Sequence, residues 1–181
     1  TQHWMAENLK VTKYRNGDEI THITVNSIWS SNTDGAYGYY ENNTTNRDTY
    51  GMLYNWYAVD NSSSRYICPE GWHVPTNSEF SNLKTELGSN SAAKLKETGT
   101  VHWANESTGT SNSSGFTALP AGYRIYNNGT YTNLRNYTYF WTSSTSGTNG
   151  IYRFLSTNSS TSFSSNNNHK TYGFSVRCIE D

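Results

Sequence analysis

The sequence has few charged residues, few prolines and no long apolar run. No stretch approaches the roughly 18 consecutive apolar residues that a membrane-spanning helix needs, so we expect no transmembrane segment within this chain. Charged residues make up only 15% of the chain, and the formal net charge is -1. Because nucleic-acid binding relies on a basic surface, a nearly neutral chain with isolated arginines argues against a nucleic-acid partner.

Motifs for catalysis and zinc binding are also missing. The chain has no GxSxG elbow, no glycine-rich phosphate loop and no HExxH or CxxC spacing. The histidines are scattered and form no zinc-binding pattern; they are His3, His22, His73, His102 and His169. We therefore expect no enzyme activity, and we interpret His73 as a hydrogen-bonded structural residue.

There are only two cysteines, Cys68 and Cys178, and both lie in apolar contexts. In an exported domain such a pair is consistent with a disulfide bond. The bond would close a loop of about 110 residues and stabilise the fold by about 4–5 kcal/mol. Two unpaired buried thiols are the alternative, since free cysteine behaves as a small apolar residue.

Small polar residues and aromatic residues are abundant. Asn, Ser and Thr together make up about two fifths of the chain, and aromatic residues make up 15%, including 15 Tyr and 6 Trp. Disordered chains are poor in aromatic residues, so the composition indicates a folded protein. Tyr with Ser, Gly and Asn is typical of binding loops. A secreted, strand-rich protein with long polar loops explains the same composition.

Two helices can be predicted from local signals. The clearer one covers residues 75–89, where Thr76 and Glu79 have the spacing of a capping box. A second, short helix is expected at 91–99, with Ser91 as its N-cap.

Most of the remaining chain is predicted to form short strands and polar loops. Aromatic or β-branched segments bounded by Gly, Asn and Ser predict strands; these segments are 115–124, 137–144, 150–156 and 172–180. The N-terminal segment 3–14 has an apolar pattern that could pair with the last strand. Together with the helices, this pattern predicts an α+β fold.

Alternation along 137–142 predicts that Tyr137, Tyr139 and Trp141 point to one face of a sheet and Phe140 to the other. We expect Tyr139, Phe140 and Trp141 to contribute at least partly to the core. The segment 156–170 is almost entirely Ser, Thr and Asn, yet it lies between two predicted strands. We interpret it as a strand-loop excursion within the domain, with Phe163 as its inward anchor.

Seven stretches carry a resemblance that spans nearly the whole chain. They are “WMAENLKVTKYRNGD” (4–18), “YGMLYNWYAV” (50–59), “ICPEGWHVPTNSEFSNL” (67–83), “AAKLKETGTVHW” (92–103), “SGFTALPAGYR” (114–124), “YFWTSS” (139–144) and “YGFSVRCIED” (172–181). In this order they resemble the Fibrobacter succinogenes major paralogous domain, a family widespread in exported proteins of Bacteroidota.

The resemblance implies a divergent C-type lectin-like fold. Residues 1–181 would form one such domain, with a half rich in helices and loops at about 1–103 and a half of sheet and loops at about 114–181. The family's chain ends lie side by side, and a disulfide typically links the first helical region to the last strand. Cys68 and Cys178 occupy the corresponding positions.

The resemblance also implies a ligand-binding surface in the C-terminal loops and strands, at about 123–170. We expect the contacts there to come from aromatic, amide and a few basic side chains. The candidates are Tyr126, Asn128, Tyr131, Asn133, Arg135, Tyr137, Asn149, Tyr152, Asn158, Asn166, Asn168 and His169. Some proteins of this fold are diversified by retroelements that mutate adenines, which turns Asn codons into codons for Ser, Thr, Tyr or His. The region 123–169 is enriched in those residues, although an Asn-, Ser- and Tyr-rich polar loop has the same composition.

The standard lectin calcium motif is absent. “FWTSST” (140–145) has no acidic residue or Asn after its Trp, and “LPAG” (119–122) has no carboxylate. The segments “NTDG” (32–35) and “NRDTYG” (46–51) could hold a calcium ion with backbone carbonyls, but Asx-turns explain them as well. We therefore expect no required cofactor.

These observations favour a recognition module that is exported or displayed on a surface. We expect it to be secreted or lipid-anchored through a region outside this chain. Its expected partner is a protein or glycan on a cell or host surface. The alternative is a structural cell-envelope domain without a dedicated ligand. An exposed cluster of Tyr and Trp on one face would favour binding.

Overall fold

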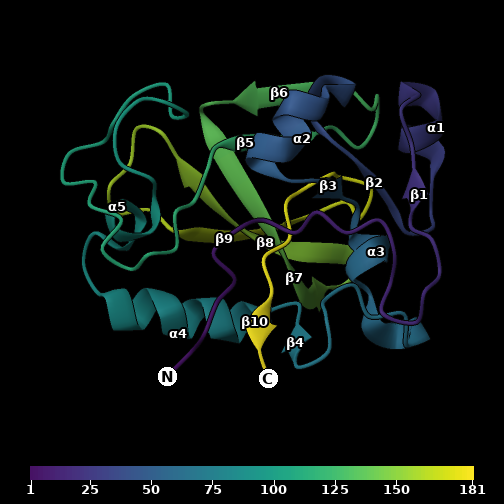
Figure 1. Cartoon of the computed structure of the whole chain (residues 1–181), viewed down its shortest axis with the longest axis horizontal. Helices are drawn as coiled ribbons and strands as arrows, with labels where there is room; N and C mark the ends of the chain where they lie inside the picture. The colour runs from purple at the N-terminus through teal and green to yellow at the C-terminus, as the bar shows by residue number, and fades with distance from the viewer.

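The computed structural model describes residues 1–181, except for the side chain of Ser63. Its elements follow one another as β1 (Thr21–His22), α1 (Asn26–Ser31), β2 (Ala36–Gly38), the 3₁₀ turn η1 (Tyr40–Asn42), α2 (Thr44–Tyr50), β3 (Leu53–Tyr54), α3 (Trp56–Val59), the 3₁₀ turn η2 (Asn61–Ser63), β4 (Trp72–His73), α4 (Asn77–Leu87), α5 (Ser91–Leu95), β5 (Ala121–Arg124), β6 (Tyr131–Leu134), β7 (Tyr137–Ser146), β8 (Asn149–Ser156), β9 (Ser164–Asn168) and β10 (Ile179–Glu180) (Figure 1). Every described helix precedes residue 96 and the longer strands follow residue 120, so the fold is α+β, as predicted.

The predicted capping box forms at the start of α4. The side chain of Thr76 accepts a hydrogen bond from the backbone N–H of Glu79, and Glu79 accepts one from the backbone N–H of Thr76. These bonds satisfy two donors that a helix N-terminus otherwise leaves free. Phe80 and Leu83 are buried on the inner side of the helix. The helix ends at Gly88, whose φ of 65° suits glycine.

The second predicted helix is shorter than expected. α5 begins at Ser91, with Asn90 in the N-cap position in a left-handed conformation. The prediction of Ser91 as N-cap is therefore wrong by one residue, and the helix ends at Lys96 instead of extending to Gly99. Lys96 leaves the helical conformation and is drawn into the core, where its ammonium donates to the carbonyls of Ser156 and Ser159.

The largest sheet has the strand order β6-β5-β7-β8-β9. β7, β8 and β9 form an antiparallel meander, whereas β5 and β7 run parallel and share only the pair Gly122–Thr138. β6 was not predicted, whereas β9 is the strand part of the predicted strand-loop excursion. β9 lies within the Ser- and Asn-rich segment 156–170, which is therefore the edge of the sheet. As predicted, Phe163 anchors this segment, since its side chain is fully buried.

The segment 172–176 fills the gap where β5 and β7 diverge. Gly173 exchanges both backbone hydrogen bonds with Arg124 of β5, at 2.9 and 3.0 Å between N and O. Ser175 bonds to Tyr139 and Trp141 of β7, at 3.0 Å each. The predicted strand 172–180 is thus a series of isolated bridges followed by the two-residue strand β10, because its residues pair with different strands in turn.

The core lies on both sides of this sheet. On one side, α4 and α5 cover a cluster that includes Phe80, Leu95, Phe140 and Phe163. On the other side, Trp141 and Phe174 pack against β3, α3 and the N-terminal segment. Since Phe140 and Trp141 enter opposite clusters, the predicted alternation of β7 is confirmed.

The two ends of the chain lie side by side (Figure 1). Trp4 pairs with Ile179, and the N–H of Leu9 donates to the carbonyl of Val176, so the predicted pairing of the N-terminal segment with the C-terminal strand is confirmed. No described helix is long and apolar enough to cross a membrane.

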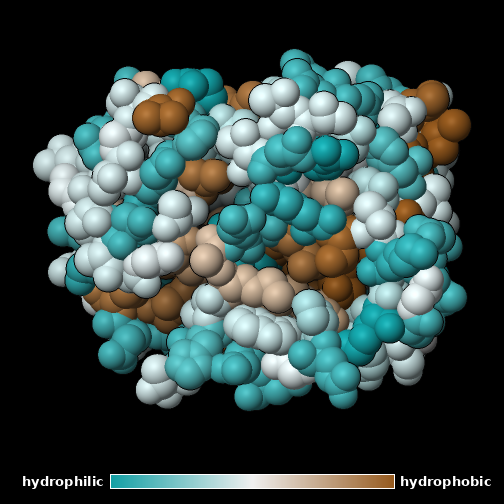
Figure 2. Space-filling view, viewed as in Figure 1, coloured by the Kyte–Doolittle hydropathy of each residue, from teal (hydrophilic) through white to brown (hydrophobic). Residues whose placement is uncertain are grey.

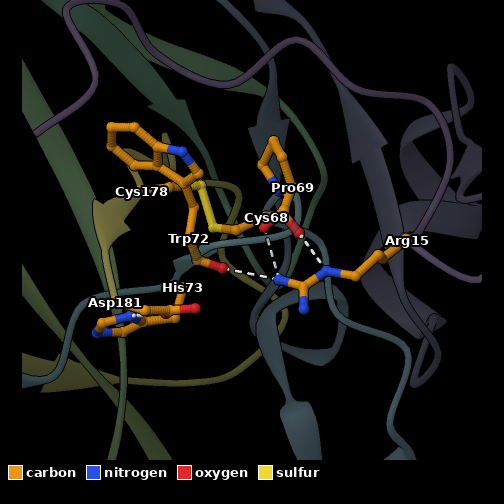
Figure 3. The surroundings of a disulfide bond; sticks show 7 residues. All are labelled: Arg15, Cys68, Pro69, Trp72, His73, Cys178 and Asp181. Atoms are coloured by element: carbon orange, nitrogen blue, oxygen red, sulfur yellow. Dashed lines mark hydrogen bonds and ion pairs between the residues drawn. A yellow bond between two sulfur atoms is a disulfide. The ribbon is translucent and has the colours of Figure 1, made fainter.

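The predicted disulfide forms between Cys68 and Cys178. It joins the loop before β4 to the residue before β10, and both half-cystines are buried. Arg15 holds the same loop by donating to the carbonyls of Cys68, Pro69 and Trp72, at 3.1, 2.6 and 2.7 Å (Figure 3). The loop is therefore fixed to both ends of the chain.

Candidate ligand-binding face

One face of the five-stranded sheet carries a continuous group of aromatic rings. Alternation puts every second residue of β7 and β8 on this face, and the cross-strand pair Tyr139–Phe154 lies at its centre. Tyr123 of β5 contacts Tyr139 across the segment 172–176, which adds its own rings between the two strands. We call this group the aromatic face; it consists of Tyr123, Tyr126, Tyr137, Tyr139, Tyr152, Phe154, His169 and Tyr172.

The rings of the aromatic face form a connected network in which Tyr139 is the stacking centre. Tyr139 stacks on Tyr137, Phe154 and the buried Phe174, with centroids 5.0–5.9 Å apart and interplanar angles of 16–24°. Tyr126 extends the group by contacting Tyr172 and His169 at 4.9 and 5.1 Å. Apart from Tyr152, which is buried, the tyrosines and Phe154 are half-buried, and His169 is exposed. The face therefore presents ring surface to solvent from a rigid base.

Side-chain amides lie near several of the tyrosine hydroxyls. Asn133 lowers the pKa of Tyr139, and Asn168 lowers the pKa of Tyr152 and of Tyr172. Burial raises the pKa of all three tyrosines, and the neighbouring tyrosines add to the effect. The hydroxyls thus stay protonated and neutral at physiological pH.

The aromatic face contains no carboxylate. Between Glu106 and Glu180 the chain has no Asp or Glu at all, and this stretch supplies every residue of the face. The charges that perturb the pKa values of Tyr123, Tyr139 and Tyr172 come only from other tyrosines.

The cations of the same stretch are engaged elsewhere. Arg124 is buried and donates to the carbonyls of Gly129 and Ile23. Arg153 lies on the opposite side of the sheet and donates to Asn77 of α4 at 2.9 Å. The ammonium of Lys170 lies 3.9 Å from the ring centre of Trp56. These contacts keep the positive charges away from the rings of the aromatic face.

The structure brings together seven of the twelve residues that the sequence suggests as ligand contacts. Four are aromatic-ring residues of the face, and the amides lie beside them: β9 pairs with β8 so that Asn166 and Asn168 share the face with Tyr152. The seven are Tyr126, Asn133, Tyr137, Tyr152, Asn166, Asn168 and His169.

The other five candidates lie away from the aromatic face. Tyr131 packs against Tyr40 and Arg124, and Arg135 donates to the carbonyls of Thr100 and Val101.

Asn149 bonds Asn167, which faces the helix side of the sheet because it alternates with Asn166. Asn128 accepts from Thr130 within its own turn, and Asn158 lies in the turn that follows β8. These residues support loops or lie at other surfaces.

Four members of the face were not among the candidates, namely Tyr123, Tyr139, Phe154 and Tyr172. Tyr139 was assigned in part to the core, although the alternation that joins it to Tyr137 also joins it to the face. The same period-two argument applied to 150–156 would have included Phe154. Tyr172 could not be found in this way, because its position depends on the insertion of 172–176 between β5 and β7.

A cleft of about 300 Å³ lies beside the N-terminal segment, on the side shown in Figure 2, where the surface is hollowed near its centre. Its charged groups already have partners within the protein. Lys10 pairs with Glu7 at 2.8 Å, Glu97 with His102 at 2.8 Å, and the buried Arg177 donates to Asn8 at 2.7 Å. The cleft therefore offers few free groups for a ligand.

No group of three or more His, Cys, Asp or Glu residues that could hold a metal ion occurs among the described residues. The two segments considered for calcium have engaged carboxylates: Asp34 pairs with Arg65 at 3.0 Å, and Asp48 pairs with Arg47 at 2.8 Å. His73 bonds Glu79 and Asp181, which confirms its interpretation as a hydrogen-bonded residue.

The fold and the face define a disulfide-linked α+β domain with an uncharged aromatic surface. The model of the Fibrobacter succinogenes major domain matches residues 1–180. The chain therefore belongs to this family, as its sequence stretches indicate. No curated protein and no solved structure matches the chain significantly.

Proposed function

We propose that this chain is a recognition module that binds its ligand through the aromatic face. The observation that carries the proposal is the clustering of half-exposed tyrosines on one face of the sheet. Half-exposed rings cost hydration free energy in the free protein, and they contribute most to binding when a partner covers them. The proposal assigns the chain no catalytic activity, and its ligand is a protein or a glycan on a cell or host surface.

The proposed fold is a divergent C-type lectin-like domain. It is supported by the adjacent chain ends, by the disulfide between the first half and the C-terminal strand, and by the antiparallel β7-β8-β9 meander that follows the helices. In such a fold the polar segment before the last strand would belong to the ligand-binding surface. The position of β9 beside the aromatic face supports this assignment.

We further propose that the module acts outside the cytoplasm, either secreted or attached to a cell surface. The disulfide supports this location, because such bonds persist in oxidising compartments. Genetic diversification of 123–169 remains a proposal that only the gene can test. A near-copy of this region that differs at adenines alone would support it.

The experiment uses the labelled whole chain and intact cells from the organism's habitat or host. The variant carries Tyr126→Ala and Tyr172→Ala, and the matched control carries Tyr66→Ala, because Tyr66 is 39% exposed and outside the aromatic face. Cell binding that the double variant loses and the control keeps is the expected result. Binding that survives the double variant, in a protein that folds normally, would contradict the proposal. If no cell surface binds the chain at all, the structural cell-envelope alternative gains support.

A further inference from the structure

We propose that the ligand of the aromatic face is an uncharged carbohydrate, bound without calcium by stacking on the tyrosine rings. This inference rests on the proposed function and specifies the chemistry of its ligand. It starts from three properties of the face that occur together: partly exposed ring surface, neutral hydrogen-bonding groups, and no acidic or basic side chain stacked on the rings.

The absence of charge argues for a neutral ligand. A charged ligand that loses its hydration on binding needs a partner of opposite charge, because burying an unpaired ion is costly. The stretch between Glu106 and Glu180 offers no carboxylate to a cationic ligand. Arg124 and Arg153 of the same stretch are buried and bonded elsewhere. Arg135 donates to the carbonyls of Val101 and Thr100, and the ammonium of Lys170 lies over the ring of Trp56, so none of these four cations is stacked on a ring of the aromatic face.

The rings provide the apolar part of the recognition. An aromatic ring carries partial negative charge on its faces, and the C–H groups of a sugar ring carry partial positive charge. A pyranose can therefore lie against Tyr126 or Tyr172, whose ring centroids are 4.9 Å apart and whose side chains are both half-buried. The parallel packing of Tyr137, Tyr139 and Phe154 continues this surface along the sheet.

The surrounding side chains provide the polar part. Sugar hydroxyls both donate and accept hydrogen bonds, and so do the amide of Asn and the hydroxyls of Ser, Thr and Tyr. Ser164, Asn166 and Asn168 of β9 follow one another at every second position along one edge of the face. The amide of Asn168 lies close enough to the hydroxyls of Tyr152 and Tyr172 to lower the pKa of both, so it stands beside the rings where a sugar hydroxyl would bind.

A protein ligand fits these properties less well. Interfaces between proteins are usually enriched in Arg as well as aromatic residues, and their charged rims steer association. The rings of the aromatic face have no Arg or Lys stacked on them among the described residues, although other rings of this chain do. We therefore commit to the carbohydrate.

The test titrates the purified whole chain with oligosaccharides in the presence of EDTA, by isothermal calorimetry. The uncharged probes are hexasaccharides of glucose, mannose and xylose, and the anionic probe is a hexasaccharide of galacturonic acid. The expected result is binding of at least one uncharged probe that EDTA does not weaken and that the galacturonate does not reproduce.

Two sets of variants connect such binding to the face. Tyr126→Ala with Tyr172→Ala should weaken it at least about tenfold, whereas Tyr66→Ala should leave it unchanged. Tyr126→Phe with Tyr172→Phe keeps the rings and should retain most of the affinity. Thermal unfolding of each variant shows whether the fold is intact.

Three outcomes overturn the inference: no uncharged probe binds, EDTA abolishes binding, or the double Ala variant binds as well as the parent. If the same variant still loses binding to protease-sensitive sites on cells, the recognition function stands and the ligand is a protein. If the chain binds neither an oligosaccharide nor a cell surface, the proposed recognition function is contradicted as well.

Discussion

Tyr139 of β7 and Phe174 of the C-terminal segment stack with their ring centroids 5.0 Å apart and their planes at 16°. The two residues are 35 positions apart in the chain, and this stack joins the half-exposed part of the aromatic face to the buried core. The rings that face solvent are therefore held by the same contacts that stabilise the fold.

The first prediction concerns this stack. Tyr139→Ala should lower the free energy of unfolding by about 3 kcal/mol, because it removes a largely buried ring and leaves a cavity. Tyr139→Phe keeps the ring and removes only the hydroxyl, whose pKa Asn133 lowers, so it should cost at most about 1 kcal/mol. Urea denaturation measures both. Equal midpoints for the parent and Tyr139→Ala would show that the ring contributes no packing.

The second prediction concerns the anchor of the segment 156–170. Phe163 is fully buried and packs edge-on against Phe80 at 5.5 Å, so Phe163→Ala should cost about 3–5 kcal/mol. The control is Asn167→Ala on the exposed edge strand, which should change the stability by less than about 0.5 kcal/mol. Similar losses for both variants would contradict the assignment of Phe163 as the anchor.

The third prediction concerns the disulfide. Replacing both Cys68 and Cys178 by Ala should lower the free energy of unfolding by about 4–5 kcal/mol, since the bond closes a loop with a sequence separation of 110 residues. A reducing agent should shift the denaturation midpoint of the parent toward that of the double variant and leave the variant unaffected. A parent whose midpoint does not respond to complete reduction would refute the prediction.

The fourth prediction concerns pH. Partial burial lowers the pKa of His73, but the hydrogen bonds with Glu79 at 2.9 Å and Asp181 at 2.7 Å outweigh it, so the pKa is raised overall. A raised folded-state pKa stabilises the protein below the ordinary histidine pKa of about 6.5, and this contribution disappears as the pH rises through the folded-state value.

His73→Gln should therefore reduce the loss of stability that accompanies a rise in pH above about 6.5. His22→Gln is the control, because burial lowers the pKa of His22 and its contribution instead disappears as the pH falls below that value. Thermal unfolding at several pH values gives both slopes. The prediction fails if His73→Gln and the parent have the same pH dependence above neutrality.

The sequence predicts those elements whose signals are local. The capping box at Thr76 and Glu79 and the apolar stripe of α4 lie within one helix, so they can be recognised without knowing the fold. The alternation in β7 is equally local, and it assigns Phe140 and Trp141 correctly to opposite sides. The disulfide between the two cysteines was predicted correctly, because they occupy the positions that the family resemblance implies.

The bounds and pairing of elements that depend on distant partners could not be predicted. β9 has the sequence Ser-Ser-Asn-Asn-Asn, which has low strand propensity, and it forms because β8 provides a partner for its backbone. The segment 172–176 has a strand-like sequence, but its residues bond in turn to β3, β5 and β7. For the same reason only seven of the twelve suggested contact residues lie on the aromatic face.

The insertion of 172–176 between β5 and β7 also has a consequence for synthesis of the protein. This segment leaves the ribosome after β5 to β9, and without it β5 and β7 are joined only by the pair Gly122–Thr138. Tyr172 and Phe174 complete the row of rings only when the segment is in place. A chain interrupted before residue 172 would therefore contain almost the whole sequence and still lack a continuous aromatic surface.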